Sequence, residues 1–166
     1  MFNFCLIFIE FYLKLVKIAK EGKGFLMNLI DQEVKFEDVG VLNRPVISKT
    51  DLRGDIVFVN SAFCKLSGYN KDELIGKSHN IVRHPDMPKA VFKELWDTIE
   101  KNQNYRGIIK NLRKDGKYYW VEVFIEPIYD DNGKKIGYIS VNKPVSREDI
   151  KKYSEIYKEL KEKESS

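Results

Sequence analysis

The sequence predicts an α+β domain in which a five-stranded antiparallel sheet is covered on one face by short helices. Strand patterns fall into two groups, at residues 45–59 and 105–143, and helical patterns fill the stretch between them. Strands grouped at the two ends of a domain favour an antiparallel sheet, because a parallel sheet needs helices that alternate with its strands. With 166 residues, the chain is long enough for one domain with a core and too short for two.

The first two strands are expected on either side of a turn that contains glycine. Residues 45–50 are rich in β-branched side chains, residues 51–54 read Asp-Leu-Arg-Gly, and residues 55–59 form the returning strand. The remaining strands are expected at residues 105–114, 117–129 and 134–143. The Asp115-Gly116 pair between the first two of these is a strong signal for a tight hairpin.

Four helical segments are expected between the two groups of strands. The first begins after Asn60, a good N-cap, and ends at Gly68, which can adopt a left-handed conformation. The second begins after Asn70, and a third, short one covers residues 78–82. The fourth is the most regular, because its apolar side chains recur with the helical period. This stripe consists of Val91, Phe92, Leu95, Trp96 and Ile99.

Strand alternation predicts which side chains point into the core. On the strand at 117–129, the uncharged face consists of Tyr119, Val121, Val123 and Ile125. On the preceding strand, Asn111 shares the inward face with Tyr105, Gly107 and Ile109. A buried amide without partners costs about 1–3 kcal/mol. Either the edge of a bound ligand or nearby backbone could satisfy Asn111.

Charge and cysteine content exclude several classes of function. The net charge is +4, and 29 basic residues are interleaved with 25 acidic ones, so there is no basic stripe of the kind that nucleic acid binding requires. Cys5 and Cys64 are isolated, which argues against a disulfide framework or a zinc site and indicates a cytoplasmic location. Neither a nucleophile–base pair nor a phosphate-binding glycine loop is present, so we expect no enzyme activity.

Both ends of the chain extend beyond the sheet. Residues 1–26 are apolar but interrupted by Glu10, Lys14 and Lys17, so we do not expect a membrane span. This extension could be an amphipathic helix, an interfacial anchor, or upstream sequence that is not normally translated, which we favour. Residues 27–42 are expected to form an N-terminal cap. Residues 146–166 predict a charged amphipathic helix with an apolar side formed by Ile150, Tyr153, Ile156, Tyr157 and Leu160.

A series of short motifs resembles a known sensor family. The motifs are Asn60-Ser61-Ala62-Phe63, Ser67-Gly68-Tyr69, Glu73-Leu74-Ile75-Gly76, His79-Asn80 and Arg83-His84-Pro85-Asp86-Met87-Pro88. Over residues 43–145 the sequence resembles a PAS domain, and more narrowly the Aer-type PAS domain of bacterial energy-taxis (aerotaxis) receptors. Its layout is similar to that of the stand-alone PAS subunit of two-protein receptors.

This resemblance implies a function and a cofactor. It implies the PAS fold, with FAD bound non-covalently between the sheet and the helices as a redox sensor. It further implies a signal that passes to a separate membrane-bound chemoreceptor with a HAMP domain, through which the protein would associate with the inner membrane. A homodimer is an additional expected assembly.

The resemblance and the residue types together give a set of expected cofactor-binding residues. They are Arg83, His84, Asp86, Trp96, Tyr105, Asn111 and Tyr119. A guanidinium can pair with a pyrophosphate, and a histidine ring can stack on or donate to a cofactor. Asp86 could bond a ribose hydroxyl or cap the following helix, and Trp96 could be either core or cofactor contact. Tyr105 stands where well-known members of the family have tryptophan.

Two alternatives to the flavin sensor stay open. The first is a haem gas sensor with His84 or His79 as the axial ligand. The second is a cofactor-free interaction module that docks through its sheet or its C-terminal helix. Light-dependent adduct chemistry is not expected, because residues 78–82 contain no cysteine.

Overall fold

The computed structural model describes residues 29–164. The chain divides into two compact units, residues 1–30 and 31–166, and all elements described below lie in the second unit. The expectations for residues 1–26, including Cys5, fall outside the described residues.

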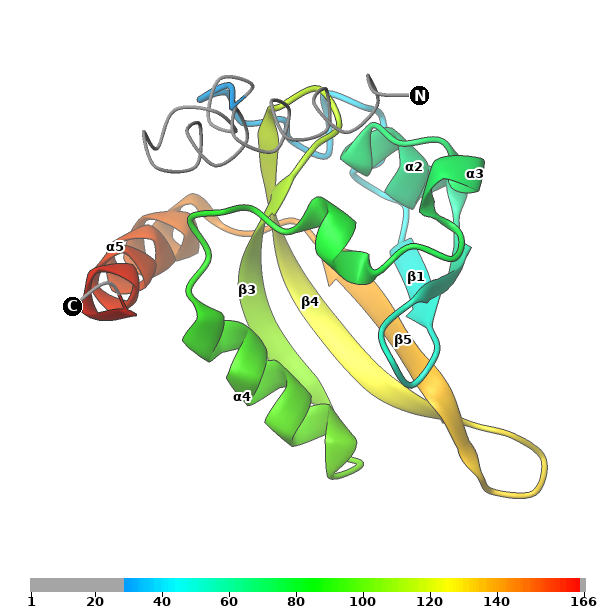
Figure 1. Ribbon diagram of the computed structural model, residues 1–166. Coiled ribbons are helices and arrows are strands. Elements are labelled where there is room, and N and C mark those ends of the chain that lie inside the picture. Colours follow the sequence, from blue (N-terminus) through cyan, green and yellow to red (C-terminus); the bar gives the residue numbers. More distant parts are fainter. Residues whose placement is uncertain (1–28, 165–166) are drawn as a thin grey trace, which may run out of the picture. The chain divides into compact units, whose positions relative to one another are not determined.

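Five strands form one antiparallel sheet with the order β2-β1-β5-β4-β3. Their bounds are β1 Val46–Thr50, β2 Ile56–Val59, β3 Tyr105–Leu112, β4 Tyr118–Tyr129 and β5 Lys135–Lys143. The helices are α2 Ser61–Ser67, α3 Lys71–Leu74, the 3₁₀ helix η2 His79–Val82, α4 Lys89–Glu100 and α5 Arg147–Glu164. Figure 1 shows α2, α3 and α4 gathered on one face of the sheet, which confirms the predicted fold class.

Asn60 joins the first helix to the first strand, as its position after β2 suggested. Its side-chain oxygen accepts hydrogen bonds from the backbone N–H groups of Phe63, at 3.0 Å, and of Ile47 in β1, at 3.1 Å. The first bond caps α2, and the second fixes the helix to the sheet. Gly68 ends α2 with a φ of 77°, in the left-handed region.

The hairpin between β3 and β4 has a longer turn than the Asp115-Gly116 pair predicts. β3 ends at Leu112, and β4 begins at Tyr118. The backbone N–H of Arg113 still donates to the carbonyl of Lys117 at 2.8 Å, so residues 114–116 form the turn, and Gly116 adopts a φ of 85° in it. The Arg113 guanidinium donates to main-chain carbonyls at the end of α2 and so links this turn to the helix.

The core lies between the sheet and the helices. The inward side chains of β4 are buried as alternation predicts, with Tyr119 and Val121 at most 1% exposed. The apolar stripe of α4 covers them, and Val91, Leu95 and Ile99 are buried in it. Before β1, Phe36 and Val41 complete the core, so part of the predicted N-terminal cap belongs to it.

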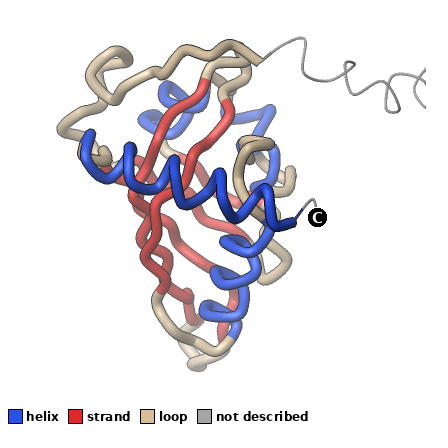
Figure 2. Tube along the Cα trace, turned by 90° about the vertical axis from the view of Figure 1, so that its left-hand side faces the viewer, coloured by secondary structure: helices blue, strands red, loops and turns tan. Residues whose placement is uncertain are grey.

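Helix α5 packs on the opposite, outer face of the sheet. The rings of Tyr157 and Trp120 stack with centroids 6.3 Å apart, and the Tyr157 hydroxyl donates to the carbonyl of Ile108 in β3. Figure 2 shows α5 crossing the strands on this side. Ile156 was expected on the apolar side of α5 but is 38% exposed, because Tyr157 takes the central position against the sheet.

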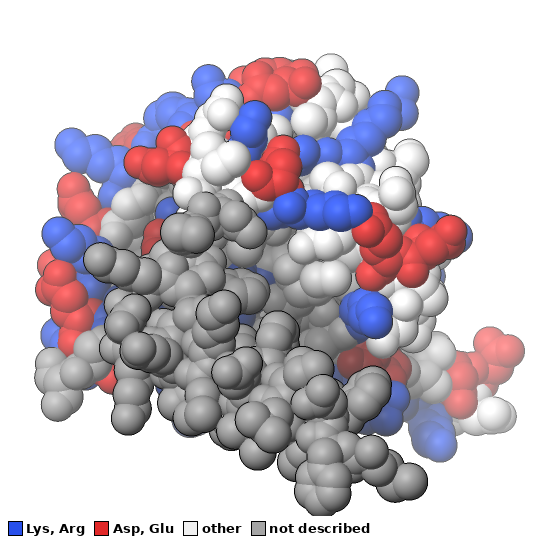
Figure 3. All heavy atoms as spheres, turned by 45° about the horizontal axis from the view of Figure 1, so that its top comes forward, with Lys and Arg blue, Asp and Glu red and all other residues white. Residues whose placement is uncertain are grey.

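The surface carries interleaved charges. On the face shown in Figure 3, Lys and Arg side chains are interspersed with Asp and Glu side chains and with uncharged surface. Within residues 29–164, the structure contains no helix with the length and apolar character that a membrane span needs.

Candidate functional site

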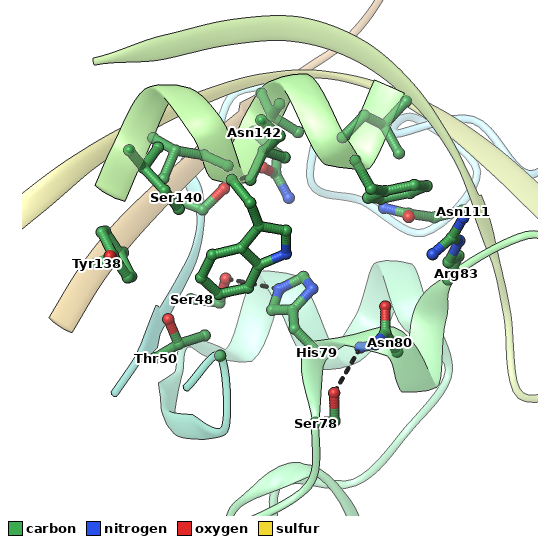
Figure 4. A pocket seen from close by; sticks show the side chains of 18 of the residues that line it. Ser48, Thr50, Ser78, His79, Asn80, Arg83, Asn111, Tyr138, Ser140 and Asn142 are labelled. Atoms are coloured by element: carbon green, nitrogen blue, oxygen red, sulfur yellow. Dashed lines mark hydrogen bonds between the residues drawn. The ribbon is translucent and has the colours of Figure 1, made fainter. Parts of the chain in front are cut away.

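A cavity of about 130 Å³ lies between the sheet and the helices. Its floor is formed by β1, β5, β4 and β3, and its roof by η2, the following loop and α4. Figure 4 shows the polar side chains of the floor and of η2 converging on this space. α4 and the central strands supply the apolar part of the wall, with Leu95, Ile99, Ile109, Val123 and Ile125.

Buried polar side chains on β1 and β5 form one half of the floor. Ser48 and Asn142 are at most 2% exposed, and Ser140 lies opposite Ser48 in the strand pairing. Ser140 Oγ donates to Asn142 Oδ1 at 2.8 Å. None of these three residues is among those expected from the sequence to bind a cofactor. The signal that identifies them is a polar side chain at alternate, inward positions of two paired strands.

His79 faces this polar floor from the start of η2. Its Nε2 lies 3.1 Å from Ser48 Oγ, and its backbone N–H donates to the carbonyl of Gly54 at 2.9 Å. The edge of its ring packs against Phe63, with 5.7 Å between centroids. Burial lowers the pKa of His79 to about 4, so the imidazole is neutral at pH 7. A neutral imidazole can offer a ligand either a donor or an acceptor.

Arg83 and Asn111 lie together at one end of the cavity (Figure 4). The Arg83 guanidinium lies over the ring of Phe92, 3.9 Å from its centroid. Among residues 29–164, no side chain forms a hydrogen bond or ion pair with this guanidinium. Its five N–H donors are therefore available to an anion in or near the cavity.

Asn111 has a partner inside the protein. Tyr119 lies directly opposite it on β4, and the interaction with the Asn111 side chain opposes the rise in the Tyr119 pKa. Burial raises the pKa of Tyr119, so its hydroxyl stays protonated. Tyr119 thus lies beside Asn111 on the inward face of the sheet, and it does not itself line the cavity.

Trp96 forms the wall opposite Arg83. Its indole reaches from α4 to the β1–β2 turn, where a Cβ placed on Gly54 would lie 3.0 Å from the indole carbons. Gly54 also has a φ of +84°, which favours glycine. The indole packs edge-on against Tyr138, with centroids 5.9 Å apart. Trp96 is therefore both a packing residue and a wall of the cavity.

Two expected cofactor residues, His84 and Asp86, lie outside the cavity wall. His84 is 4% exposed, and its Nδ1 accepts the backbone N–H of Asp86 at 3.2 Å. Burial, followed by the nearby charge of Lys110, lowers the pKa of His84 to about 4, so its 3.4 Å approach to the Asp86 carboxylate is no ion pair at pH 7. Asp86 pairs with Lys110 at 2.7 Å. The N-cap of α4 is Pro88, so the expectation that Asp86 caps this helix is wrong.

Tyr105 also lies outside the wall. Its ring covers Gly107 on the same strand, where an added Cβ would lie 2.5 Å from the tyrosine hydroxyl. Burial raises the pKa of Tyr105 to about 12. Of the seven expected residues, the structure thus brings Arg83, Trp96 and Asn111 into the cavity wall. For the other four residues, direct contact with a ligand stays a prediction, and their positions outside the cavity wall do not support it.

Comparisons with known proteins identify the class of this fold. The family model described as the PAS fold matches residues 56–142. The chain therefore belongs to the PAS fold family.

The similar proteins include receptors and regulators. The chain is 43% identical to the aerotaxis receptor of Escherichia coli strain K12 over 115 residues, which cover 69% of this chain and 22% of the receptor. It is 31% identical to the nitrogen fixation regulatory protein of Klebsiella oxytoca, over 60% of this chain and 20% of that protein. The solved PAS domain of a protein from Colwellia psychrerythraea matches 67% of this chain and 96% of its own, with 27% identity and a TM-score of 0.57. The chain thus spans about a fifth of these two curated relatives.

Proposed function

We propose that this chain is a redox-sensing PAS domain that binds FAD non-covalently in the cavity and signals to a separate membrane-bound chemoreceptor. The observation that carries the proposal is the Arg83 guanidinium, which has no hydrogen-bond or ion-pair partner within residues 29–164 and lies at one end of a cavity floored by buried amide and hydroxyl groups. Its resemblance to energy-taxis PAS domains, and the 43% identity to a protein named aerotaxis receptor, support the same function.

The residues of the wall fit a flat ring with apolar faces and a polar edge. Leu95 and Val123 offer apolar surface, while Asn111, Asn142 and Ser48 offer donors and acceptors. The isoalloxazine ring of FAD has this character. The cavity volume of about 130 Å³ is below the roughly 300–1,000 Å³ of typical ligand pockets, so a ring-sized part of the cofactor would lie inside and the dinucleotide tail outside.

Each wall residue would then have a defined task. Arg83 binds the anionic tail, because a guanidinium pairs bidentately with phosphate oxygens. Asn111 and Asn142 hydrogen-bond the ring edge, and Trp96 excludes water. Bound FAD supplies the reversible electron storage that a redox sensor needs.

The geometry favours a flavin over a haem. The Nε2 of His79 is already bonded to Ser48, and His84 lies outside the cavity wall. A porphyrin is larger than the ring of a flavin, so a cavity of about 130 Å³ fits it less well. A haem sensor is therefore the weaker candidate.

A docking surface for the chemoreceptor is available on the outer face of the sheet. Phe58 is 38% exposed there, with Lys49 5.6 Å from its ring centroid, and Lys143 lies 4.8 Å from that of Phe124. Apolar rings beneath cations match a partner that presents carboxylates and apolar side chains. We assign this partner to the HAMP-containing receptor, which would hold the protein at the cytoplasmic side of the inner membrane. The alternative partner on this face is a second copy of the chain, which would form a homodimer.

Titration of the purified full chain with three ligands tests the proposed cofactor. The ligands are FAD, riboflavin, which lacks the pyrophosphate, and haemin. We expect the wild type to bind FAD more tightly than riboflavin by tenfold or more, as one charge-assisted contact is worth about 1.5–3 kcal/mol. Arg83→Ala should abolish this preference.

The matched control removes a different arginine. Arg106 lies on β3, pairs with Glu122 and does not line the cavity. Arg106→Ala should therefore keep the wild-type preference for FAD over riboflavin. Tight binding of haemin with no binding of either flavin would overturn the proposal.

A further inference from the structure

The last turn of α5 contacts the segment that carries Arg83. This segment, residues 83–90, presents the Arg83 side chain to the cavity and its backbone to α5. Lys161 Nζ donates to the carbonyl of Met87 at 3.4 Å, and the backbone N–H of Ala90 donates to Glu164 Oε1 at 2.9 Å. The last turn of the helix on the outer face thus bonds the segment that carries Arg83.

Glu164 supplies a cap that α4 lacks in its own sequence. The N-cap of α4 is Pro88, which makes no side-chain hydrogen bond. The first N–H groups of a helix need partners from outside the helix, and a carboxylate is favoured there by the helix dipole. Here the carboxylate comes from a residue 74 positions further along the chain. The last turn of α5 is therefore held by a charge-assisted contact.

The same carboxylate acts on Arg83. Burial lowers the pKa of Arg83, and the negative charge of Glu164 opposes this shift. Glu164 therefore stabilises the positive charge that the cavity offers to a ligand. A phosphate bound to Arg83 would interact with the same cation as Glu164. The phosphate and the Glu164 carboxylate would then repel each other, because both are negatively charged.

The rest of α5 has anchors that do not depend on Arg83. Tyr157 stacks on Trp120 and donates to the Ile108 carbonyl, and Arg147 pairs with Glu33 through its two terminal nitrogens, Nη1 and Nη2. A weaker Glu164 contact would therefore release only the last turn and leave the helix docked.

We propose that Glu164 and the anionic part of the ligand compete for Arg83, so that ligand binding and docking of the last turn of α5 oppose each other. The proposal rests on the proposed function for the identity of the anion. Ligand binding in the cavity would then change the last turn of α5, a surface segment that a partner protein can contact.

Two variants with the same change in charge test the competition. Glu164→Gln keeps an oxygen for Ala90 but removes the charge, whereas Glu159→Gln removes a charge from an exposed position of the same helix. In the full chain, Glu164→Gln should bind FAD about 2- to 5-fold more tightly than both the wild type and Glu159→Gln. The gain in FAD affinity should become smaller at high ionic strength, because salt screens the charge of Glu164. Equal affinities for FAD in Glu164→Gln and Glu159→Gln would overturn the proposal.

A second measurement separates this inference from the identity of the cofactor. Amide exchange of the wild type is followed with and without inorganic pyrophosphate, which carries the anionic chemistry without a flavin. We expect pyrophosphate to speed exchange at Ala90 and at residues 161–164, and Arg83→Ala to remove this response. If FAD binds to no variant but the response is present, the proposed function fails and the competition stands. If pyrophosphate leaves exchange at these residues unchanged, the competition is wrong whatever the cofactor.

Discussion

At the scale of single residues, the cavity depends on polar groups that are paired inside the protein. Asn111 lies beside Tyr119 and interacts with its hydroxyl, and neither side chain is more than 5% exposed. Asn111→Ala should lower the free energy of unfolding by about 1–3 kcal/mol in the cofactor-free protein, because it leaves the Tyr119 hydroxyl buried without a partner. Urea denaturation measures this change.

A double-variant cycle shows whether the loss comes from this pair. Tyr119→Phe removes the hydroxyl, so adding Asn111→Ala to it should cost less than Asn111→Ala costs in the wild type. Strictly additive losses would show that the two side chains do not depend on each other.

The neutral state of His84 predicts a pH dependence of stability. Its pKa is about 4 in the folded protein and ordinarily 6.5, so between these values the unfolded chain binds a proton that the folded protein does not. Stability should therefore fall as the pH is lowered from 6.5 towards 4. Between pH 6.5 and 5 the loss from this residue is on the order of 2 kcal/mol.

The test compares urea unfolding at pH 7 and pH 5 for the wild type and His84→Gln. The charged groups that face His84 are Lys110, Asp86 and Asp31, and all three stay in the variant. We expect a smaller loss of stability at pH 5 in His84→Gln than in the wild type. The same loss in both proteins would contradict a neutral His84.

Residues of the site differ in how far sequence could identify them. Asn111 and the serines of the floor follow from strand alternation, a property of the backbone that needs no tertiary information. The place of His84 depends on how the loop after η2 turns, and that of Tyr105 on the space above Gly107. Both are set by packing between distant segments, which no local pattern encodes.

At the scale of elements, helix and strand bounds followed from caps and periodicity, but the docking of α5 did not. The apolar side of this helix predicts burial without saying which surface covers it. The structure shows that it covers Trp120 on the outer face of β4, a residue that alternation assigns to solvent. Contact with α5 therefore buries the Trp120 side chain, which strand alternation alone would place in solvent.

A pair of adjacent substitutions tests the docking of α5. Tyr157 is 7% exposed and Ile156 is 38% exposed. Tyr157→Ala should remove exchange protection from α5 and quench or shift the fluorescence of Trp120, since it deletes both the stacked ring and the bond to β3. Ile156→Ala should leave both signals close to the wild type. Equal protection of α5 in the two variants would show that Tyr157 is not its anchor.

At the scale of the whole molecule, the sheet separates the cavity on one face from α5 on the other. The ligand would act on Arg83 and the polar floor, while α5 and the exposed rings of the outer face are available to a partner. Segment 83–90 contacts both sides, because it carries Arg83 and bonds the end of α5. This arrangement explains how the state of a bound group could reach a partner on the other face of the sheet.

The claim that the cavity holds a flavin is tested most directly by the absorption spectrum of the full chain, purified without added cofactor. We predict the visible bands of an oxidised flavin, their loss on reduction with dithionite, and the release of FAD on heat denaturation. A folded protein that is colourless and takes up no FAD, or one that shows the Soret band of a haem, would contradict the claim.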